Sequence, residues 1–306
     1  MLVGIVDIGS NTIRMNVYRC EGEDAVLLFT KKETAGLIAY VKKGVLSEKG
    51  IQKACSVIRS FRWDMECLGI QEFHYFSTAS LRNLKNREEV LKKIQEKCEV
   101  TIEVLSGNKE ARLSFLGALG HLEEKDGIFI DVGGGSSEIV IFEKGKIVES
   151  GSMPVGSLSL FEQYAGKLLP QKEEKKKMVK RVEKELDQLF LSRKKYSFMC
   201  GVGGSIRGIE KLLEDLDLQK KDSKDMNVDK LSRLEAELCE NEKKCYQKIL
   251  QVKPDRIHTL VPGILIIKTI AQYFGVKKIQ ISKYGVREGY LNEKVLKIGD
   301  CYETLR

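Results

Sequence analysis

Two short segments rich in glycine and hydroxyl residues constrain the fold of this chain more than any other feature. Each follows an apolar, strand-like run that ends in an aspartate, and each is followed by a second apolar run. The two segments read Asp7-Ile8-Gly9-Ser10-Asn11-Thr12 and Asp131-Val132-Gly133-Gly134-Gly135-Ser136-Ser137. One such turn is common in β-hairpins. Its repetition in the same strand context predicts two facing half-sites that hold one phosphate chain.

Each predicted half-site offers the groups that a phosphate and its counter-ion require. Asp7 and Asp131 carry hard oxygen ligands for Mg²⁺, and Glu138 is either a third metal ligand or an ordinary exposed strand carboxylate. Glycine turns let backbone amides approach phosphate oxygens, and hydroxyl groups can add to them. The residues expected to contact phosphate in the two segments are Gly9, Ser10, Asn11, Thr12, Gly133, Gly134, Gly135, Ser136 and Ser137.

Two charged residues near these segments are further candidates, each with a plain alternative. Arg14 follows the first segment, where a guanidinium could fork onto phosphate oxygens, but a lone arginine is also typical of a surface strand. Glu110 falls in the first turn of a predicted helix that follows a strand. It could act as a general base there, or it could only complement the helix dipole.

The composition describes an ordinary soluble protein. The 306 residues suggest two domains or one large domain, and 42% hydrophobic with 31% charged residues suffice for a normal core. No apolar stretch reaches the roughly 18–20 residues of a membrane span, and the N-terminus does not resemble a secretory signal. The eight cysteines form no CxxC pair. Their spacing favours free thiols in a reducing cytoplasm over zinc sites or disulfides.

The charge distribution allows a polyanionic substrate. The formal net charge is +8, and lysines are concentrated in residues 172–181. This run is either a solvated helix face or a positive rim that attracts a long anion. It contains acidic residues and lacks interleaved aromatic residues, so we do not expect a nucleic-acid surface.

The predicted elements repeat along the chain. An opening meander of three strands, the last near residues 25–30, returns in residues 128–150, as in actin-like or sugar-kinase-like duplications. The turn at residues 123–127 predicts a boundary between domains of residues 1–124 and 125–306. Helices are expected over residues 48–68 (with Ser47 as N-cap), 87–97, 108–119, 171–190, 228–252, 262–274 and 289–298, further strands over 72–76, 101–105, 198–202 and 278–282, and a loop over 220–225.

Further short motifs accompany the two segments in a fixed order. They are Ile13-Arg14 after the first segment, Thr78-x-x-x-Arg82-x-x-x-Asn86, Ser106-Gly107-x-x-Glu110-Ala111, Glu138 after the second segment, Ser152-Met153-Pro154-Val155-Gly156, Gly203-Gly204-Ser205 and Tyr284-Gly285-Val286-Arg287-Glu288-Gly289. Together they resemble the exopolyphosphatase/guanosine pentaphosphate phosphohydrolase family of the actin-like ATPase superfamily. The resemblance extends over residues 3–291.

This resemblance implies an α/β fold of two actin-like (ribonuclease H-like) domains, with a duplicated mixed β-sheet and the active site in an interdomain cleft. It implies that Glu110 activates water, that Asp131 holds metal or orients water, and that Arg14, Arg82 and Asn86 join the loops in binding phosphate. Mg²⁺ or another divalent cation would be the cofactor. The last helix, about residues 288–306, is expected to pack back on the N-terminal domain.

Some positions depart from the family pattern. Ser80 and Leu84 stand where alanine is frequent, Ser159 where an arginine is usual, and His258 where an acidic residue is usual. The chain also ends near residue 306, so we expect a short form without the extra C-terminal region of longer members. These departures bear on substrate affinity and chain length more than on the type of reaction.

We therefore predict a cytoplasmic, metal-dependent exopolyphosphatase with inorganic polyphosphate as substrate and no nucleic-acid or membrane partner. A homodimer is one option for its assembly. The nearest alternative is hydrolysis of guanosine pentaphosphate (pppGpp) to ppGpp. A non-catalytic sensor of polyphosphate or an alarmone is a second alternative, and an actin-like sugar or acetate kinase is the least favoured one.

Overall fold

The structure is a computed structural model. The structure describes residues 1–190, 194–221, 223, 225–240 and 242–298. They form two compact units, residues 1–113 with 287–298, and residues 114–286. Residues 299–306 of the predicted last segment lie outside the described residues, and the helical part of that segment groups with the first unit.

The chain changes unit inside two helices. The first change is in α4 (Gly107–Leu119), after Leu113, and the second is in α11 (Val286–Lys294), after Val286. The chain therefore leaves the first unit within α4, before the boundary predicted after residue 124. The predicted turn at residues 123–127 follows this helix. The assignment of a functional half-site to each domain stays a prediction.

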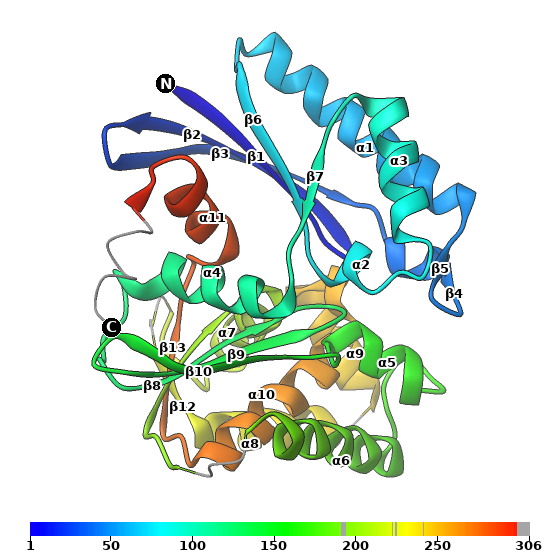
Figure 1. Cartoon of the computed structure of the whole chain (residues 1–306). Helices are drawn as coiled ribbons and strands as arrows, with labels where there is room; N and C mark the ends of the chain where they lie inside the picture. The colour runs from blue at the N-terminus through cyan, green and yellow to red at the C-terminus, as the bar shows by residue number, and fades with distance from the viewer. Residues whose placement is uncertain (191–193, 222, 224, 241, 299–306) are drawn as a thin grey trace. The chain divides into compact units, whose positions relative to one another are not determined.

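The first unit is built on a mixed sheet with the strand order β3-β2-β1-β6-β7 (Figure 1). The first three strands form an antiparallel meander, and the last two run parallel to β1. The bounds are β1 Leu2–Ile8, β2 Thr12–Glu21, β3 Asp24–Thr34, β6 Glu72–Ser77 and β7 Ile102–Val104, with a separate small pair of β4 Val41–Lys42 and β5 Val45–Leu46.

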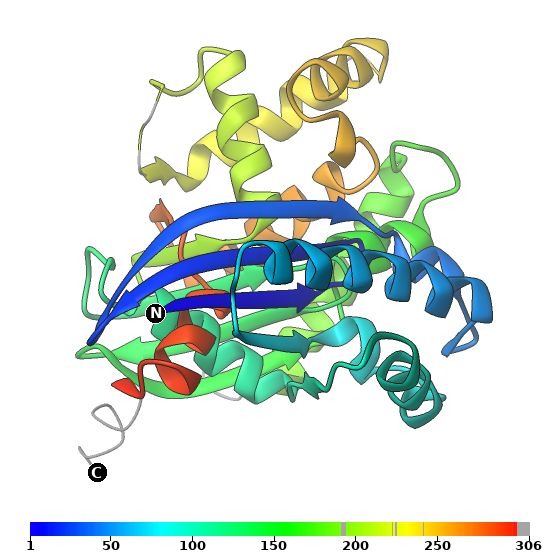
Figure 2. The ribbon, with the colours of Figure 1, turned by 90° about the horizontal axis from the view of Figure 1, so that it is seen from above.

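Helix α1 (Glu48–Cys67) covers one face of this sheet, as Figure 2 shows. The Ser47 side chain accepts a hydrogen bond from the Gly50 amide, which confirms the predicted N-cap. Apolar residues recur every three or four positions, so one stripe of α1 packs on the sheet. The unit also contains α2 Ala79–Arg82, α3 Arg87–Cys98 and the 3₁₀ turn η1 Leu37–Tyr40.

The second unit repeats the same arrangement with the strand order β10-β9-β8-β11-β13-β12. Its antiparallel meander is again followed by two strands parallel to the first, and β12 is added at the edge. The bounds are β8 Gly127–Val132, β9 Ser137–Glu143, β10 Lys146–Met153, β11 Phe198–Val202, β12 Asp225–Asn227 and β13 Lys278–Ile281. The predicted internal duplication is confirmed.

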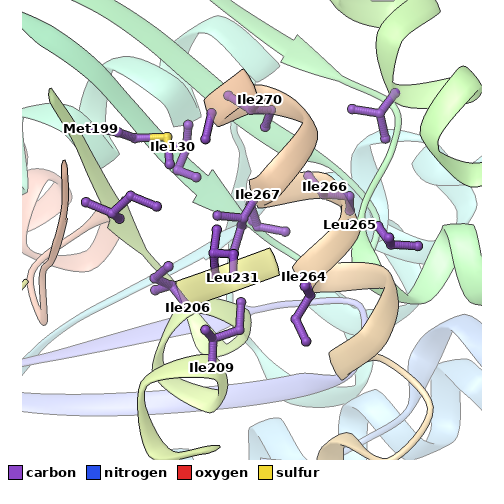
Figure 3. Packing of buried hydrophobic residues seen from close by; sticks show 14 of the residues in the cluster. Ile130, Met199, Ile206, Ile209, Leu231, Ile264, Leu265, Ile266, Ile267 and Ile270 are labelled. Carbon is purple, nitrogen blue, oxygen red and sulfur yellow. The ribbon is translucent and has the colours of Figure 1, made fainter. Parts of the chain in front are cut away.

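Helix α10 (Leu260–Phe274) forms the centre of the second core. It is apolar on almost every side, which is the pattern of a helix surrounded by protein. Figure 3 shows its isoleucines among Ile206, Ile209 and Leu231 from neighbouring helices. The other helices are α5 Ser157–Tyr164, α6 Lys172–Leu189, α7 Gly204–Asp215, α8 Val228–Glu240, α9 Glu242–Val252 and the 3₁₀ turn η2 Pro254–Arg256.

A few predicted elements were wrong in detail. The helix expected over 228–252 is two helices, α8 and α9, with residue 241 outside the described residues. The loop expected over 220–225 ends in β12, whose pairing with β13 is a tertiary effect. The last helix starts earlier than expected, directly after the Tyr284-Gly285 turn. Helix α5 and the short elements α2, η1, η2, β4 and β5 were not predicted.

The structure agrees with the expected cysteine chemistry where it describes cysteines. Six cysteines have side chains that the structure describes. Five of these are buried, Cys67 is exposed, and all six are free thiols. Among the helices of the described residues, none has both the length and the apolar composition needed to cross a membrane.

Candidate active site

The first glycine segment forms a tight turn between β1 and β2. The Gly9 amide donates a hydrogen bond to the Thr12 carbonyl at 3.1 Å. A Cβ atom at position 9 would lie 2.9 Å from that same carbonyl oxygen, so the turn requires glycine there. Ser10 and Asn11 lie within this turn, and Thr12 begins β2.

Neighbouring segments fix the carbonyl groups of the first turn. The Ile38 amide donates to Ser10 O at 3.1 Å, and the Gly36 amide donates to Asn11 O at 2.9 Å. The Ser10 and Asn11 amides donate to no backbone carbonyl within the described ranges. This side of the turn can therefore offer donors to an anion.

Asp7 lies at the end of β1 and forms an ion pair with Arg287. Arg287 was named in the sequence analysis only as a member of a motif. Asp7 Oδ2 accepts a hydrogen bond from Arg287 Nη1 at 3.1 Å, and Arg14 is the cross-strand partner of Asp7 on β2. Burial raises the pKa of Asp7, and the charges of Arg287 and Arg14 only partly oppose this shift. Asp7 is thus a carboxylate set between two guanidinium groups.

Glu110 lies in the first turn of α4 and forms an ion pair with Arg82. Arg82 Nη1 is 2.6 Å from Glu110 Oε2, and 16% and 9% of the two side chains are exposed. Arg82 Nη1 also donates to the Leu105 carbonyl at 3.1 Å, which ties it to the chain just before α4. A charge-assisted hydrogen bond of this kind fixes the orientation of the carboxylate.

Asn86 has a structural contact. Its Oδ1 accepts from the Leu46 amide at 3.0 Å and its Nδ2 donates to the Leu46 carbonyl at 3.1 Å. The side chain thus pairs with strand β5 as a backbone group would. Its predicted contact with phosphate would have to compete with these two hydrogen bonds.

The second half-site is centred on Asp131 and Glu138, which are direct partners across β8 and β9. Asp131 Oδ2 accepts from Ser114 Oγ at 3.0 Å. Glu138 Oε1 accepts from Ser136 Oγ and Ser152 Oγ, both at 2.8 Å. Glu138 is buried, so it is not the exposed strand carboxylate of the alternative interpretation. Paired residues of an antiparallel ladder project from the same face, so the two carboxylates are neighbours.

Two other motifs of the second unit meet at Asp131. Gly203 has a φ of +97°, and a Cβ atom there would lie 2.9 Å from Asp131 Oδ1. A Cβ atom at Gly285 would lie 4.0 Å from Asp131 Oδ2. Glycine at position 203 therefore serves both the backbone conformation and the approach of this turn to the carboxylate.

The first turn of helix α5 donates backbone hydrogen bonds to the second glycine segment. The Ser157 amide donates to Gly133 O, and the Leu158 and Ser159 amides donate to Gly134 O, all at 2.9 Å. The Gly133 amide donates to Ser136 O at 3.0 Å and closes the turn. The first-turn amides of α5 are thereby satisfied by the loop.

The hydroxyl groups of this segment are also committed to the protein. Ser137 is fully buried, and its Oγ donates to the Val155 carbonyl at 2.7 Å. Ser136 Oγ donates to Glu138. Ser137 is therefore better placed to hold the loop than to touch a ligand.

Gly156→Ala should disturb the second segment selectively. A Cβ atom at Gly156 would lie 2.4 Å from Gly134 O, and a backbone atom cannot move aside as a flexible side chain can. We expect a loss of about 1–3 kcal/mol in the free energy of unfolding, measured by denaturant titration. Gly120→Ala is the matched control, because no atom lies within 4 Å of its Cβ position. Equal stability of both variants would contradict the packing described here.

Three departures from the family pattern have local contacts in the structure. Ser159 Oγ accepts from the Gly156 amide at 2.8 Å and donates to the Gly156 carbonyl at 3.1 Å, so it caps α5. The His258 ring packs on Phe161, with centroids 5.3 Å apart. Burial lowers the pKa of His258, and the nearby Arg256 lowers it further. Ser80 Oγ donates to the Ile8 carbonyl and so stabilises the end of β1.

The donor set for a divalent cation is better in the second unit than in the first. Asp131 and Glu138 supply adjacent carboxylate oxygens, the ligand type that Mg²⁺ prefers. Asp7 is the weakest of the three predicted ligands, because Arg287 occupies one of its oxygens. No group of three or more His, Cys, Asp or Glu side chains is arranged for a metal among the described residues.

Three residues of these half-sites had no role assigned from the sequence. They are Arg287 at Asp7, Ser114 at Asp131 and Ser152 at Glu138. Ser152 and Arg287 lie in motifs that the sequence analysis named, so their role at the site could have been proposed from the sequence. Ser114 is one hydroxyl residue in the middle of a helix, and no sequence pattern indicated a role for it.

Residues 17–298 match the Ppx/GppA phosphatase family. The chain is 28% identical to the bifunctional 3-dehydroquinate synthase/phosphatase of Fusobacterium nucleatum over 302 residues, which cover 91% of this chain and 44% of that protein. The chain thus spans less than half of this relative.

Two crystal structures show the same fold. An exopolyphosphatase from Cytophaga hutchinsonii gives a TM-score of 0.84 at 20% identity and covers 97% of this chain and 98% of its own. The Ppx/GppA family member from Aquifex aeolicus gives 0.79 at 24% identity, with 97% and 98% covered. The predicted α/β fold of two actin-like domains is confirmed. The chain belongs to the Ppx/GppA phosphatase family.

Proposed function

We propose that this chain is an exopolyphosphatase, which hydrolyses the terminal phosphoanhydride bond of inorganic polyphosphate and releases orthophosphate. The observation that carries the proposal is the buried ion pair of Glu110 and Arg82, with 2.6 Å between Oε2 and Nη1. A carboxylate fixed in this way can accept a proton from water without moving. Family membership supports the reaction class, and the exopolyphosphatase name of the Cytophaga relative supports this substrate.

In this proposal, Glu110 takes the proton of the water that attacks the terminal phosphorus. The bond from that phosphorus to the bridging oxygen breaks, and the shortened polyphosphate leaves with the bridging oxygen. Arg82 orients Glu110 and shares its charge with the terminal phosphate. The amides of the two glycine segments and Arg14 bind the phosphate oxygens, because fixed donors stabilise the charge of phosphoryl transfer.

Mg²⁺ would be held by Asp131 and Glu138, where it would neutralise phosphate charge. Ser114, Ser136 and Ser152 orient the two carboxylates through their hydrogen bonds. Such supporting contacts commonly determine how well a metal is bound. Asp7 would instead keep Arg287 in place beside the first segment.

Hydrolysis of pppGpp to ppGpp is the second candidate, because its terminal phosphates present the same anionic end. The free thiols of the described cysteines suit a compartment that keeps thiols reduced, so we place either activity in the cytoplasm.

The two substrates can be ranked directly. Phosphate release is measured from polyphosphates of defined length and from pppGpp at equal concentrations of chain ends, with Mg²⁺ and with excess EDTA. We expect faster release from polyphosphate, and loss of release in EDTA. Faster release from pppGpp would exchange the two candidates. Inertness toward both substrates with Mg²⁺ present would overturn the enzymatic proposal.

A further inference from the structure

Strand β3 exposes an unusual apolar run at the edge of the first sheet. It is the terminal strand in the order β3-β2-β1-β6-β7, as seen in Figure 1. Four consecutive residues are exposed, namely Val26 (51%), Leu27 (48%), Leu28 (46%) and Phe29 (37%). Successive residues of a strand point to opposite faces, so both faces of this edge are apolar and uncovered.

Such an edge is normally protected in a protein that stays monomeric. Charged side chains, prolines or a covering helix usually prevent an edge strand from pairing with another chain. The middle of β3 has none of these, because its charges stand at the two ends, at Asp24 and at residues 31–33. An apolar centre with charged ends is the pattern of an interface with a polar rim.

A bulge in β3 gives this pattern a two-fold symmetry. Val17 of β2 pairs with Phe29, but the next residue, Tyr18, pairs with Leu27, so Leu28 is an extra residue. Residues of β3 that pair with every second position of β2 lie on one face of the sheet. On the face covered by α1 these residues are Asp24, Val26, Phe29, Lys31 and Glu33. Without the bulge, positions 29 and 31 would lie on the opposite face.

We propose that two copies of this chain pair through β3 as antiparallel strands, with the two-fold axis between Leu27 and Leu28. Antiparallel pairing about this point places Val26 against Phe29 of the second copy. It also places Asp24 against Lys31 of the second copy. Each contact occurs twice, since the interface is symmetric.

The bulge makes this register consistent. In an antiparallel pair, two opposed residues either both point their backbone N–H and C=O groups at the partner strand or both point them away from it. Val26 and Phe29 pair with Arg19 and Val17, which are two positions apart on β2 and therefore share one orientation. The register thus joins apolar residues at the centre and opposite charges at the rim. Lys31 already pairs with Asp64 at 2.6 Å, so in the dimer it would lie between two carboxylates.

The assembly is tested by sedimentation equilibrium across a range of concentrations. We expect the wild type to form a dimer and Val26→Lys to shift it toward monomer by at least 10-fold in the dissociation constant. Val148→Lys is the matched control, because Val148 is 59% exposed on β10, the edge strand of the other sheet. It should leave the dimer unchanged. Val26 is already exposed, so circular dichroism should show both variants folded.

The register is tested by mixing two variants that each gain one cysteine on β3, Val26→Cys and Phe29→Cys, both in a Cys67→Ser background that lacks the exposed native thiol. Oxidation of the mixture should give a cross-linked dimer, and oxidation of either variant alone should not. Identical positions would be roughly 10 Å apart, beyond the reach of a disulfide. A wild type that is monomeric at all concentrations would overturn the proposal, as would a dimer without this cross-link. Neither result depends on hydrolysis of any substrate, so this proposal and the proposed function fail separately.

Discussion

Replacing Glu110 by glutamine should lower phosphate release from polyphosphate by a factor of about 10²–10⁴, the range of general-base contributions. Glutamine has nearly the same shape, and its carbonyl oxygen can still accept the hydrogen bond from Arg82. It cannot take the proton of water. The variant should therefore keep its fold and its affinity for polyphosphate and lose turnover. The measurements are kcat from phosphate release and Kd from titration with polyphosphate of defined length.

Glu103→Gln is the matched control for this experiment. Glu103 is a partly buried carboxylate of the same unit, on β7, and accepts hydrogen bonds from Lys109 and Tyr290. It has no part in the proposed chemistry and should keep most of its turnover. A Glu110→Gln variant with wild-type turnover would refute the assignment of the base. A wild type that binds polyphosphate without any turnover would favour the sensor alternative.

The fold could be predicted largely from the sequence, because its signals are local. Apolar runs that end in Asp7 and Asp131 mark two equivalent strand ends, and the strands after each turn complete the two meanders. Ser47 marks the start of α1 by its capping hydrogen bond. Strand β12 could not be predicted, since Asp225, Met226 and Asn227 become a strand only by pairing with β13. The start of α5 depends in the same way on the carbonyls of Gly133 and Gly134.

The sequence named candidate site residues, but it could not predict the contacts that these residues make. The family resemblance implied that Arg82 and Asn86, four residues apart, are phosphate ligands. The structure pairs Arg82 with Glu110 and Asn86 with the backbone of Leu46. These partners are distant along the chain, so no local pattern could assign them. Ser137 likewise fits a phosphate loop by composition, although its hydroxyl is bound to Val155.

Asp131→Asn should raise the Mg²⁺ concentration needed for half-maximal phosphate release by at least about 10–100-fold. Loss of a residue that merely supports a metal ligand already costs about that much, and a direct ligand should cost no less. Asparagine retains an oxygen that can accept from Ser114, whose Oγ lies 3.0 Å from Asp131 Oδ2. The fold of β8 should therefore survive while one negative charge is lost from the site. The measurement is a Mg²⁺ titration of the rate at saturating polyphosphate.

Asp126→Asn is the control that separates a local effect from a general loss of charge. Asp126 lies just before β8, and its carboxylate accepts from the Lys144 amide at 2.9 Å on the exposed side of the turn. Removing its charge changes the net charge of the protein as much as Asp131→Asn does, so both variants alter the long-range field equally. Only Asp131 stands beside Glu138 in the ladder, and only its variant should change the Mg²⁺ dependence. Equal Mg²⁺ curves for Asp131→Asn and the wild type would remove Asp131 from the metal site and leave it with the orientation of water.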